Sequence, residues 1–491
     1  MRLFKVMMVL ALVFAVSAIA YAETQSVKVS GDIAMRSFAR NNYDLDSNDA
    51  EAGTGEEASD WATYLTSTAE VQIDADLTDN VSGVIRLVNQ RTWGDSNYTS
   101  QADELGQVGA PFVDQVSART VQQQTDLNAF KVDVDLAYIE LKEFLYSPLT
   151  LRIGRQDLWF GRGFIIGANL LDPQNSTFPY EYTAIQSFDA IRATLDYDPW
   201  TIDGIFAKIR ENARRADDDT NLWGVNIGYV FEDYNAEAEA YWFFKQVRYT
   251  GAGTNLGTVP STVDGVQNND VHTIGLRGSF DPIEDWTIAL EGAVQVGEYM
   301  GAASQVDTRD RIGWAFDGMV ECRYFQDQFA WRPVVSAEYI YYSGEEDLGN
   351  VTANNNNSVY EGWDPMFRGK FDTAIREFQN IFYRTGMTSC PSSTNQHQVL
   401  LKGTVEPTDS LTCTAVYGSF WMAEDFADYN GAVAENKESH VGQEVDLNVT
   451  WDYTEDVQFG ILSAWFFPGD HFTGGQQDVA TDLVGSVKLS F

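Results

Sequence analysis

The chain is built from short runs in which apolar and polar residues alternate. In the run 149–157, Leu151 and Ile153 fall on one face and Arg152 falls on the other. Alternation with a period of two is typical of a β-strand with one apolar and one polar face. About thirty residues rich in Gly, Asn and aromatics separate this run from the next one, 187–197, which is too many for a hairpin turn. The pattern predicts two strands joined by a long functional loop.

About eighteen such runs follow one another along the chain, and the remainder is predicted to be loop. Each run is long enough to cross a lipid bilayer as a tilted strand. The expected strands are 27–39, 63–78, 81–93, 130–143, 149–157, 187–197, 200–210, 221–231, 235–247, 271–280, 286–298, 311–325, 328–342, 396–405, 410–422, 440–453, 456–467 and 479–491. The chain is therefore predicted to be all-β.

The connections between these strands alternate between short and long. The short ones contain the turn-forming residues Thr78-Asp79-Asn80, Ser147-Pro148, Asp198-Pro199, Glu232-Asp233-Tyr234, Asp281-Pro282, Gln326-Asp327, Pro407-Thr408-Asp409 and Thr454-Glu455-Asp456. The long ones are 40–62, 94–129, 158–186, 211–220, 248–270, 299–310, 343–395, 423–439 and 468–478. This rhythm predicts a transmembrane antiparallel up-and-down β-barrel with short periplasmic turns, long extracellular loops and both termini on the short-turn side.

One face of many strands is apolar and ends in an aromatic residue beside a short turn. These terminal aromatics are Tyr197, Trp200, Phe231, Phe280, Trp286, Phe325, Phe329 and Tyr453. Aromatic rings gather at the lipid–water boundary, where an apolar ring and a polar tip are both accommodated. A soluble β-sandwich core is the alternative, but it has no reason to place aromatics at strand ends.

Both ends of the chain carry export signals. Residues 1–22 combine Arg2 and Lys5, an apolar run, and a small-x-small ending at Ala22, which predicts a secretory signal peptide that leaves Glu23 first. The last strand alternates up to a terminal Phe491, and it resembles the C-terminal sequence by which barrel-assembly machinery recognises outer-membrane proteins. We expect a bacterial outer-membrane protein with one barrel domain over 23–491.

Composition excludes several other classes. Net charge is −40 and the isoelectric point is about 4.2, which rules out a general nucleic-acid binder. Three cysteines, Cys322, Cys390 and Cys413, are too few for a disulfide framework. Four histidines, none beside a nucleophile motif, argue against an enzyme, and the chain carries no sign of a cofactor or a catalytic metal.

The polar strand faces are expected to line a water-filled lumen. Its predicted cations are Arg36, Arg86, Arg152, Arg192, Lys208, Arg210, Arg277, Arg323, Arg332, Lys402 and Lys488. Its predicted acids are Asp32, Glu70, Asp74, Asp76, Asp133, Asp135, Asp196, Glu237, Glu239, Glu291, Asp317, Glu321, Glu338, Glu444, Asp446 and Asp452. Arginine suits carboxylate and phosphate groups because its planar donors bind them bidentately. Alternatively, these charges pair with one another and set no selectivity.

Three motifs resemble the alginate-export porin family. They are Gly154-Arg155-Gln156-Asp157-Leu158 with Phe160-Gly161 and Ile165-Ile166-Gly167, then Ser187-Phe188-Asp189-Ala190-Ile191-Arg192, and a weaker Asp364-Pro365-Met366-Phe367. Ala190 stands where the family usually has glycine. The resemblance implies a monomeric eighteen-stranded barrel, and the family's best-known member exports an anionic polyuronate through an arginine-lined pore.

The resemblance also implies roles for single residues. Arg155 and Arg192 would be pore cations, with Asp157 and Asp189 as their partners. Counting by alternation puts Arg155 opposite Arg152, so that either a bulge intervenes or Arg155 lies beyond the membrane rim. The full set of expected pore-lining or substrate residues is Arg86, Arg152, Arg155, Asp157, Asp189, Arg192, Asp196, Arg277 and Arg323.

Two loops carry weaker signals. Asp44, Asp46, Asn48 and Asp49 resemble the start of a calcium loop, but the glycine and glutamate that such a loop needs are missing. A solvated acidic loop is the simpler interpretation, and divalent ions bridging it to lipopolysaccharide are the alternative. Residues 365–384 predict a short helix or an inward-folded loop that would act as a constriction or lid.

The sequence thus predicts a passive outer-membrane channel for anionic oligosaccharide or polysaccharide, or for other small polar solutes. The alternatives are a general or cation-preferring diffusion porin and, further away, a soluble secreted carbohydrate-binding β-protein. Expected partners are outer-membrane lipid and lipopolysaccharide, an anionic or neutral oligosaccharide solute, and the barrel-assembly machinery through Phe491. A monomer is expected, and no nucleic acid.

Overall fold

The computed structural model describes residues 26–43, 45, 61–93, 132–146, 148–170, 182–211, 219–250, 266–299, 309–345, 359–377, 394–424, 438–472 and 477–491. The expected signal peptide, the acidic residues Asp44 to Asp49, and Cys390 lie outside these residues. So does the second half of the segment 365–384, from residue 378 onward.

Nineteen strands and one short 3-10 helix are the named elements of the described residues, and Arg376 and Glu377 are also helical. The strands are β1 (Ser26–Asn41), β2 (Trp61–Thr78), β3 (Val81–Thr92), β4 (Asp133–Leu141), β5 (Leu149–Gln156), β6 (Phe188–Tyr197), β7 (Trp200–Arg210), β8 (Thr220–Phe231), β9 (Ala236–Thr250), β10 (Val266–Ile283), β11 (Trp286–Tyr299), β12 (Arg309–Cys322), β13 (Val334–Tyr342), β14 (Val359–Tyr360), β15 (Gln396–Thr408), β16 (Leu411–Met422), β17 (His440–Asp452), β18 (Val457–Pro468) and β19 (Ala480–Ser490). The 3-10 helix is η2 (Glu232–Tyr234). None of the helical structure described is long and apolar enough to cross a membrane.

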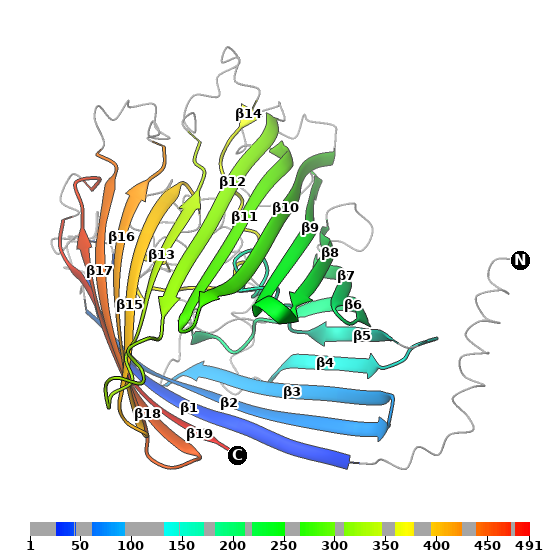
Figure 1. Ribbon diagram of the computed structural model, residues 1–491, viewed down its shortest axis with the longest axis horizontal. Coiled ribbons are helices and arrows are strands. Elements are labelled where there is room, and N and C mark those ends of the chain that lie inside the picture. The colour runs from blue at the N-terminus through cyan, green and yellow to red at the C-terminus, as the bar shows by residue number, and fades with distance from the viewer. Residues whose placement is uncertain are drawn as a thin grey trace, which may run out of the picture.

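Eighteen of the strands form a closed antiparallel barrel, as the sequence predicted (Figure 1). Each strand pairs with its neighbours in chain order, and β1 pairs with β19 from Asp32↔Ser490 to Asn41↔Thr481, which closes the cylinder. The remaining strand, β14, pairs in parallel with the first residues of β12 and was not predicted. The short and long connections lie at opposite ends of the barrel, because successive strands run in opposite directions.

The predicted strands 311–325 and 328–342 are both too long. β12 ends at Cys322 and β13 begins at Val334, so the connection between them is a series of turns. Its aromatic residues were attributed to strands, but Phe329 packs instead against Phe325 and Trp331, with ring centroids 6.3 and 6.1 Å apart. Local ring packing therefore replaces the strand pairing that the aromatic content suggested.

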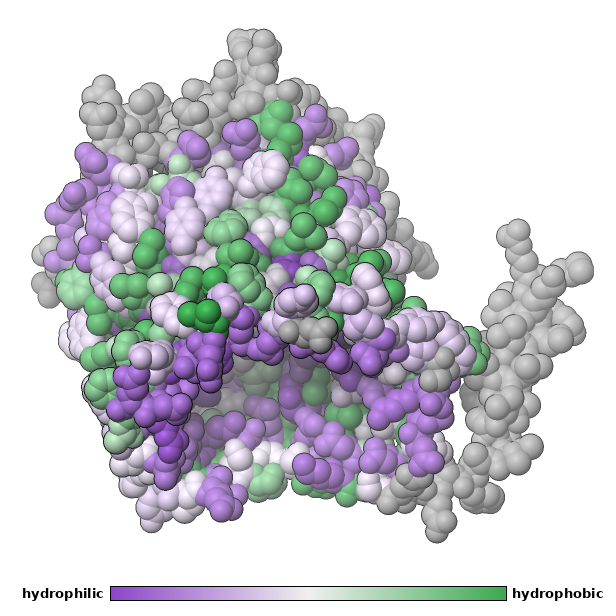
Figure 2. Space-filling model, viewed as in Figure 1, coloured by the Kyte–Doolittle hydropathy of each residue, from purple (hydrophilic) through white to green (hydrophobic). Residues whose placement is uncertain are grey.

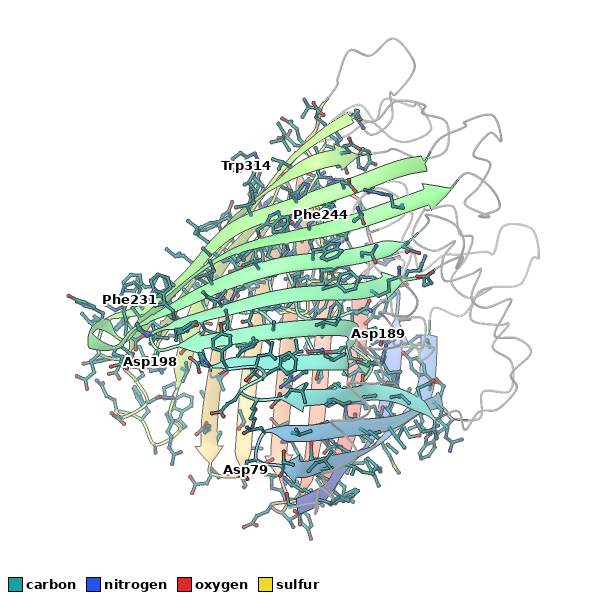
Figure 3. All side chains as sticks on the ribbon, turned by 90° about the vertical axis from the view of Figure 1, so that its right-hand side faces the viewer. Asp79, Asp189, Asp198, Phe231, Phe244 and Trp314 are labelled. Atoms are coloured by element: carbon teal, nitrogen blue, oxygen red, sulfur yellow. The ribbon has the colours of Figure 1, made fainter. Side chains whose placement is uncertain are left out.

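The outer surface of the barrel carries the apolar strand faces, as predicted. All eight aromatic residues predicted beside short turns are at least 36% exposed. Figure 3 shows Phe231 near the short-turn end, close to Asp198, and Trp314 on the outside of the sheet. Large apolar side chains exposed in a continuous belt are stable only in contact with lipid, so this belt marks the membrane-facing surface.

The inside of the barrel differs between its two halves. In the short-turn half the inward positions are polar, and Figure 2 shows this end as a hollow rimmed by hydrophilic residues. In the long-loop half many inward positions are apolar and buried, although polar side chains such as Gln295, Gln398 and Glu444 are buried among them. The apolar positions are Ala190, Ile205, Leu222, Phe243, Val271, Ile340, Leu400, Phe420, Phe466 and Ala480. The expectation of a lumen that is polar throughout is therefore wrong for this half, which is packed with inward-folded loop.

Candidate functional site

The first inward segment, residues 157–170, continues directly from β5 into the lumen. Leu158 and Phe164 are 0% and 1% exposed there, and Phe160 lies beside Phe243 of β9 with ring centroids 5.3 Å apart. Fully burying a side chain of this size contributes about 1.5–3 kcal/mol to stability. The apolar inward face of the wall therefore holds this segment inside the barrel.

The second inward segment, residues 359–377, comes from the longest loop and is fixed to the wall by polar contacts. The Asp364 backbone N–H donates to Gln295 Oε1 at 2.7 Å, and Gln295 Nε2 donates to the Asp364 carbonyl oxygen at 2.8 Å. Lys245 forms an ion pair with the Asp364 carboxylate. Burial raises the pKa of Asp364, but Lys245 and Arg311 outweigh burial and hold that pKa below its ordinary value. The carboxylate is therefore charged at neutral pH and anchors the loop.

The two segments join each other inside the lumen. Ile166 and Phe367 form a parallel bridge, in which the Phe367 N–H donates to the Ile165 carbonyl oxygen at 3.1 Å. A Cβ atom on Gly167 would lie 2.8 Å from Cα of Gly369, so both positions need the close approach that glycine permits. The alginate-export-like motif around Ile166 and the weaker motif that ends at Phe367, about two hundred residues apart in the chain, are thus parts of one interlocked pair of loops.

Four charged side chains attach this loop pair to β12 and β13. Arg162 lies 3.2 Å from Asp317, and Lys370 lies 2.5 Å from Glu338 and 3.4 Å from Asp317. Burial lowers the pKa of Lys370, but Asp372 and then Asp317 outweigh burial and raise that pKa above its ordinary value. Both loop cations therefore remain charged and neutralise carboxylates of the wall.

Two buried carboxylates of β17 hold the end of the second segment. The Ile375 and Arg376 N–H groups donate to Glu444 at 2.6 and 2.8 Å, and the Ala374 N–H donates to Asp446 at 3.0 Å. Backbone donors that leave water need acceptors of this kind, since each unpaired donor costs about 1–3 kcal/mol. Residues 365–375 therefore form the inward-folded loop of the two predicted alternatives, and helical structure begins at Arg376 and Glu377, the last residues described in this segment.

Arg152 and Arg192 lie side by side on the inner wall. They are register partners on β5 and β6, on the face opposite the exposed Ile153. Arg152 Nε donates to Glu140 at 3.0 Å, and Arg192 Nε donates to Asp203 at 2.8 Å. Each arginine therefore already has a carboxylate partner on a neighbouring strand.

Arg86 has three carboxylates around it. Its Nε donates to Asp135 at 2.6 Å, its Nη2 lies 3.6 Å from Asp157, and its Nε lies 3.9 Å from Glu70. Asp135 is fully buried, whereas 52% of the Asp157 side chain is exposed. Asp157 thus pairs with Arg86 of β3 rather than with Arg155, its neighbour in the chain.

Arg155 and Asp189 pair at the long-loop rim, 3.7 Å apart. Asp189 shares its face with the exposed Ile191 and alternates with the buried Ala190, which puts it on the outward side (Figure 3). The register of β5 runs through Gly154 without an inserted residue, and Gly154 has a φ of +125°. The alternation therefore continues to Arg155, which pairs with the outward Asp189 at the rim, and no bulge intervenes.

The other expected pore residues lie elsewhere on the wall. Arg277 pairs with Glu237 at 3.4 Å and with another glutamate of β9. Arg323 lies just beyond β12, 3.7 Å from Glu321. Asp196 is exposed near the short-turn end of β6.

The loop cations Arg162 and Lys370 were missed by sequence reasoning, and so were Lys245 and Gln295. Arg162 stands between two glycines, Gly161 and Gly163, which is the one local signal that pointed to it. Within the described ranges, no group of three or more His, Cys, Asp or Glu side chains is arranged to hold a metal ion. What the site provides is a barrel interior in which two loops pack against one half of the wall, with paired charges along the wall.

Comparison with known proteins places these features in context. The family profile described as Alginate export matches residues 46–486. Among solved structures, Acinetobacter baumannii OccAB4 superposes with a TM-score of 0.52 at 10% identity, covering 96% of this chain and 100% of its own. A BenF-like porin from Pseudomonas fluorescens Pf-5 does so with a TM-score of 0.52 at 10% identity, covering 95% and 100%. At such low identity these likenesses establish the fold alone. A comparison with curated proteins gave no match.

Proposed function

The chain belongs to the alginate-export family of outer-membrane channels, and from this premise we propose that it passes small hydrophilic solutes by passive diffusion and favours cations over anions. The observation that carries the proposal is the pairing of the arginines. Each of the six arginines expected to line the pore has a carboxylate oxygen no farther than 3.7 Å away. An anionic solute would have to displace these carboxylates, whereas a cation meets the excess of acids directly.

Two features support a cation preference in particular. Carboxylates outnumber the cations that they surround, as at Arg86 and Arg277, where one arginine faces three and two acids respectively. The chain as a whole has a net charge of −40, which raises the local concentration of cations near its mouths.

A planar bilayer holding the purified protein under a KCl gradient tests the proposal. We expect a reversal potential with the sign of K⁺ permeation, smaller at high salt because screening weakens the field of the wall. A reversal potential with the sign of Cl⁻ permeation would exclude a cation-preferring channel.

Passage of an anionic oligosaccharide is the second candidate, and the family profile favours it. The test adds oligouronates to one side of the same bilayer. Concentration-dependent interruption of the current would support this substrate, and an unchanged current at millimolar oligouronate would count against it.

Several further properties belong to the same proposal. Residues 1–22 are removed on export, and residues 23–491 form one monomeric barrel domain that needs no catalysis. Its surroundings are outer-membrane lipid and lipopolysaccharide, and Phe491 presents the chain to the barrel-assembly machinery. N-terminal sequencing of the protein from outer membranes is expected to begin at Glu23, and a sequence that begins at Met1 would exclude the cleavage.

A further inference from the structure

The strand β4 contains a bulge that faces the lumen. Arg86 of β3 pairs with Leu136, but the next residue, Leu87, pairs with Val134, so Asp135 has no partner on β3. A bulge of this kind re-aims the extra side chain and is frequent where a barrel wall carries function. Here the extra side chain is that of Asp135, which is 0% exposed.

Asp135 is held in place from two directions. Arg86 Nε donates to one of its carboxylate oxygens at 2.6 Å. Ser187, where the chain returns from the long loop to β6, donates to the other carboxylate oxygen at 3.0 Å and to the Asp135 main-chain oxygen at 2.5 Å. Both carboxylate oxygens are therefore satisfied, and the charge is fixed beneath the arginine.

The remaining neighbours of Arg86 face water. Asp157 at 3.6 Å and Glu70 at 3.9 Å have side chains that are 52% and 20% exposed, against 22% for Arg86 itself. One arginine thus stands among three carboxylates, of which the buried one makes the closest contact. The buried Asp135 therefore neutralises the charge of Arg86 from the side away from the lumen.

We propose that Asp135 is a positioning residue that sets the charge preference of the channel by neutralising Arg86. This inference rests on the proposed function and deepens it. With Asp135 charged, Arg86 serves as a scaffold that holds Glu70 and Asp157 at the water surface, and the wall attracts monovalent cations. Without Asp135 the cluster loses one negative charge, Arg86 keeps only the two more distant carboxylates of Asp157 and Glu70, and the wall favours cations less.

The charge balance predicts the size of the effect. One unit charge about 10 Å from an ion in water changes the energy of that ion by about 0.4 kcal/mol, close to a factor of two in occupancy. Cations and anions shift in opposite directions, so that the ratio of K⁺ to Cl⁻ permeability changes by about fourfold. Because Asp135 is out of contact with water, salt in the lumen screens it little before it acts on Arg86.

The experiment measures reversal potentials of the full-length protein for five variants. Asp135→Asn removes the charge but keeps an oxygen for Ser187, and we expect the K⁺ to Cl⁻ permeability ratio to fall about fourfold. Arg86→Gln is expected to raise the ratio, and the double variant is expected to return close to the wild-type ratio, because both charges are then absent. Asp79→Asn, which makes the same chemical change in the short turn between β2 and β3, is the matched control and is expected to leave the ratio unchanged (Figure 3).

Heat-modified mobility on gels checks that each variant is a folded barrel, and Asp135→Glu provides a rescue that keeps the charge. A folded Asp135→Asn channel with the wild-type ratio would overturn the inference. A double variant whose ratio stays as low as that of Asp135→Asn alone would also overturn it, since the low ratio would not then come from the charge of Arg86. An anion-selective wild-type channel would refute the proposed function, while a further shift toward anions in Asp135→Asn would still support the role of Asp135.

Discussion

Gly154 has a φ of +125°, and a Cβ atom at that position would lie 2.2 Å from the Ala137 carbonyl oxygen. The next two residues, Arg155 and Gln156, are both buried, and Gln156 Nε2 donates to the Ala190 carbonyl oxygen at 2.9 Å. The residues of this motif therefore lock β5 to its neighbouring strands where the first inward segment begins. The residues that resemble a family motif thus have a structural role where the inward segment begins.

Gly154→Ala is expected to destabilise the barrel by about 1–3 kcal/mol, since alanine is strained at this backbone conformation and meets the neighbouring strand. The measurement is the urea midpoint of unfolding in detergent micelles, followed by the gel mobility of the folded form. Gly204→Ala is the matched control, because a Cβ atom at Gly204 meets nothing within 4 Å. Equal midpoints for the two variants would show that the backbone at Gly154 is not under constraint.

At the scale of elements, the two inward segments behave as one unit. They share a parallel bridge at Ile166 and Phe367, and charged residues of both meet the same carboxylate, Asp317. The second segment is further tied to β9, β11 and β17 through polar contacts of Asp364 and of residues 374–376. Because so many contacts hold the two segments, they form a fixed constriction. Opening it would require many contacts to break together.

Glu444→Ala removes the acceptor for two backbone N–H groups, at a cost of about 1–3 kcal/mol for each donor left unpaired. We expect a larger and noisier single-channel conductance, because the end of the second segment is no longer held against β17. Glu455→Ala, the same change in the exposed turn before β18, serves as control and should conduct as the wild type does. If the two variants conducted alike, the carboxylate of Glu444 would not be holding the constriction.

The sequence predicted the strands well, because a period of two and turn residues are local signals. It failed at residues 323–333, where aromatic residues pack among themselves, and in the long-loop half of the lumen. Alternation shows that a strand has two faces, but it does not tell whether an inward leucine such as Leu222 meets water or a loop. The contact of Gly167 with Gly369 joins two distant parts of the chain, and neither part contains a pattern that names the other.

For the candidate site, the sequence identified residue types better than partners. Arg86, Arg152 and Arg192 were expected on the inner wall, and their strands put them there. Which carboxylate each one meets depends on register, and for Arg86 it depends on a bulge at Asp135 that shifts the pairing by one residue. A single sequence gives no signal for such an insertion.

At the scale of the whole molecule, closure depends on the seam between the first and last strands. The Gly31 N–H donates to the Phe491 carbonyl oxygen and the Phe491 N–H donates to the Gly31 carbonyl oxygen, both at 3.0 Å. A Cβ atom on Gly31 would lie 2.8 Å from the Phe491 ring, so the ring lies directly over this glycine. The terminal aromatic residue therefore has a structural place in the seam besides the recognition proposed for it.

Removal of Phe491 separates these two roles. We expect the amount of folded barrel in cells to fall more than the yield of refolding into detergent, because assembly machinery acts only in the cell. Phe459→Ala, which removes an exposed aromatic residue from neighbouring β18, controls for the loss of ring surface. Equal losses in cells and in detergent would assign the whole effect to the seam.

The filling of the barrel interior is one-sided, and this has a consequence for electrical behaviour. Ions driven from the short-turn end cross the wide half of the lumen before they reach the constriction. Ions driven from the opposite end meet the constriction first. Such a conduit rectifies, so that equal voltages of opposite sign carry unequal currents. We expect the current–voltage curve of oriented channels in symmetric salt to bend. A straight line through the origin would show that the constriction does not make the channel asymmetric.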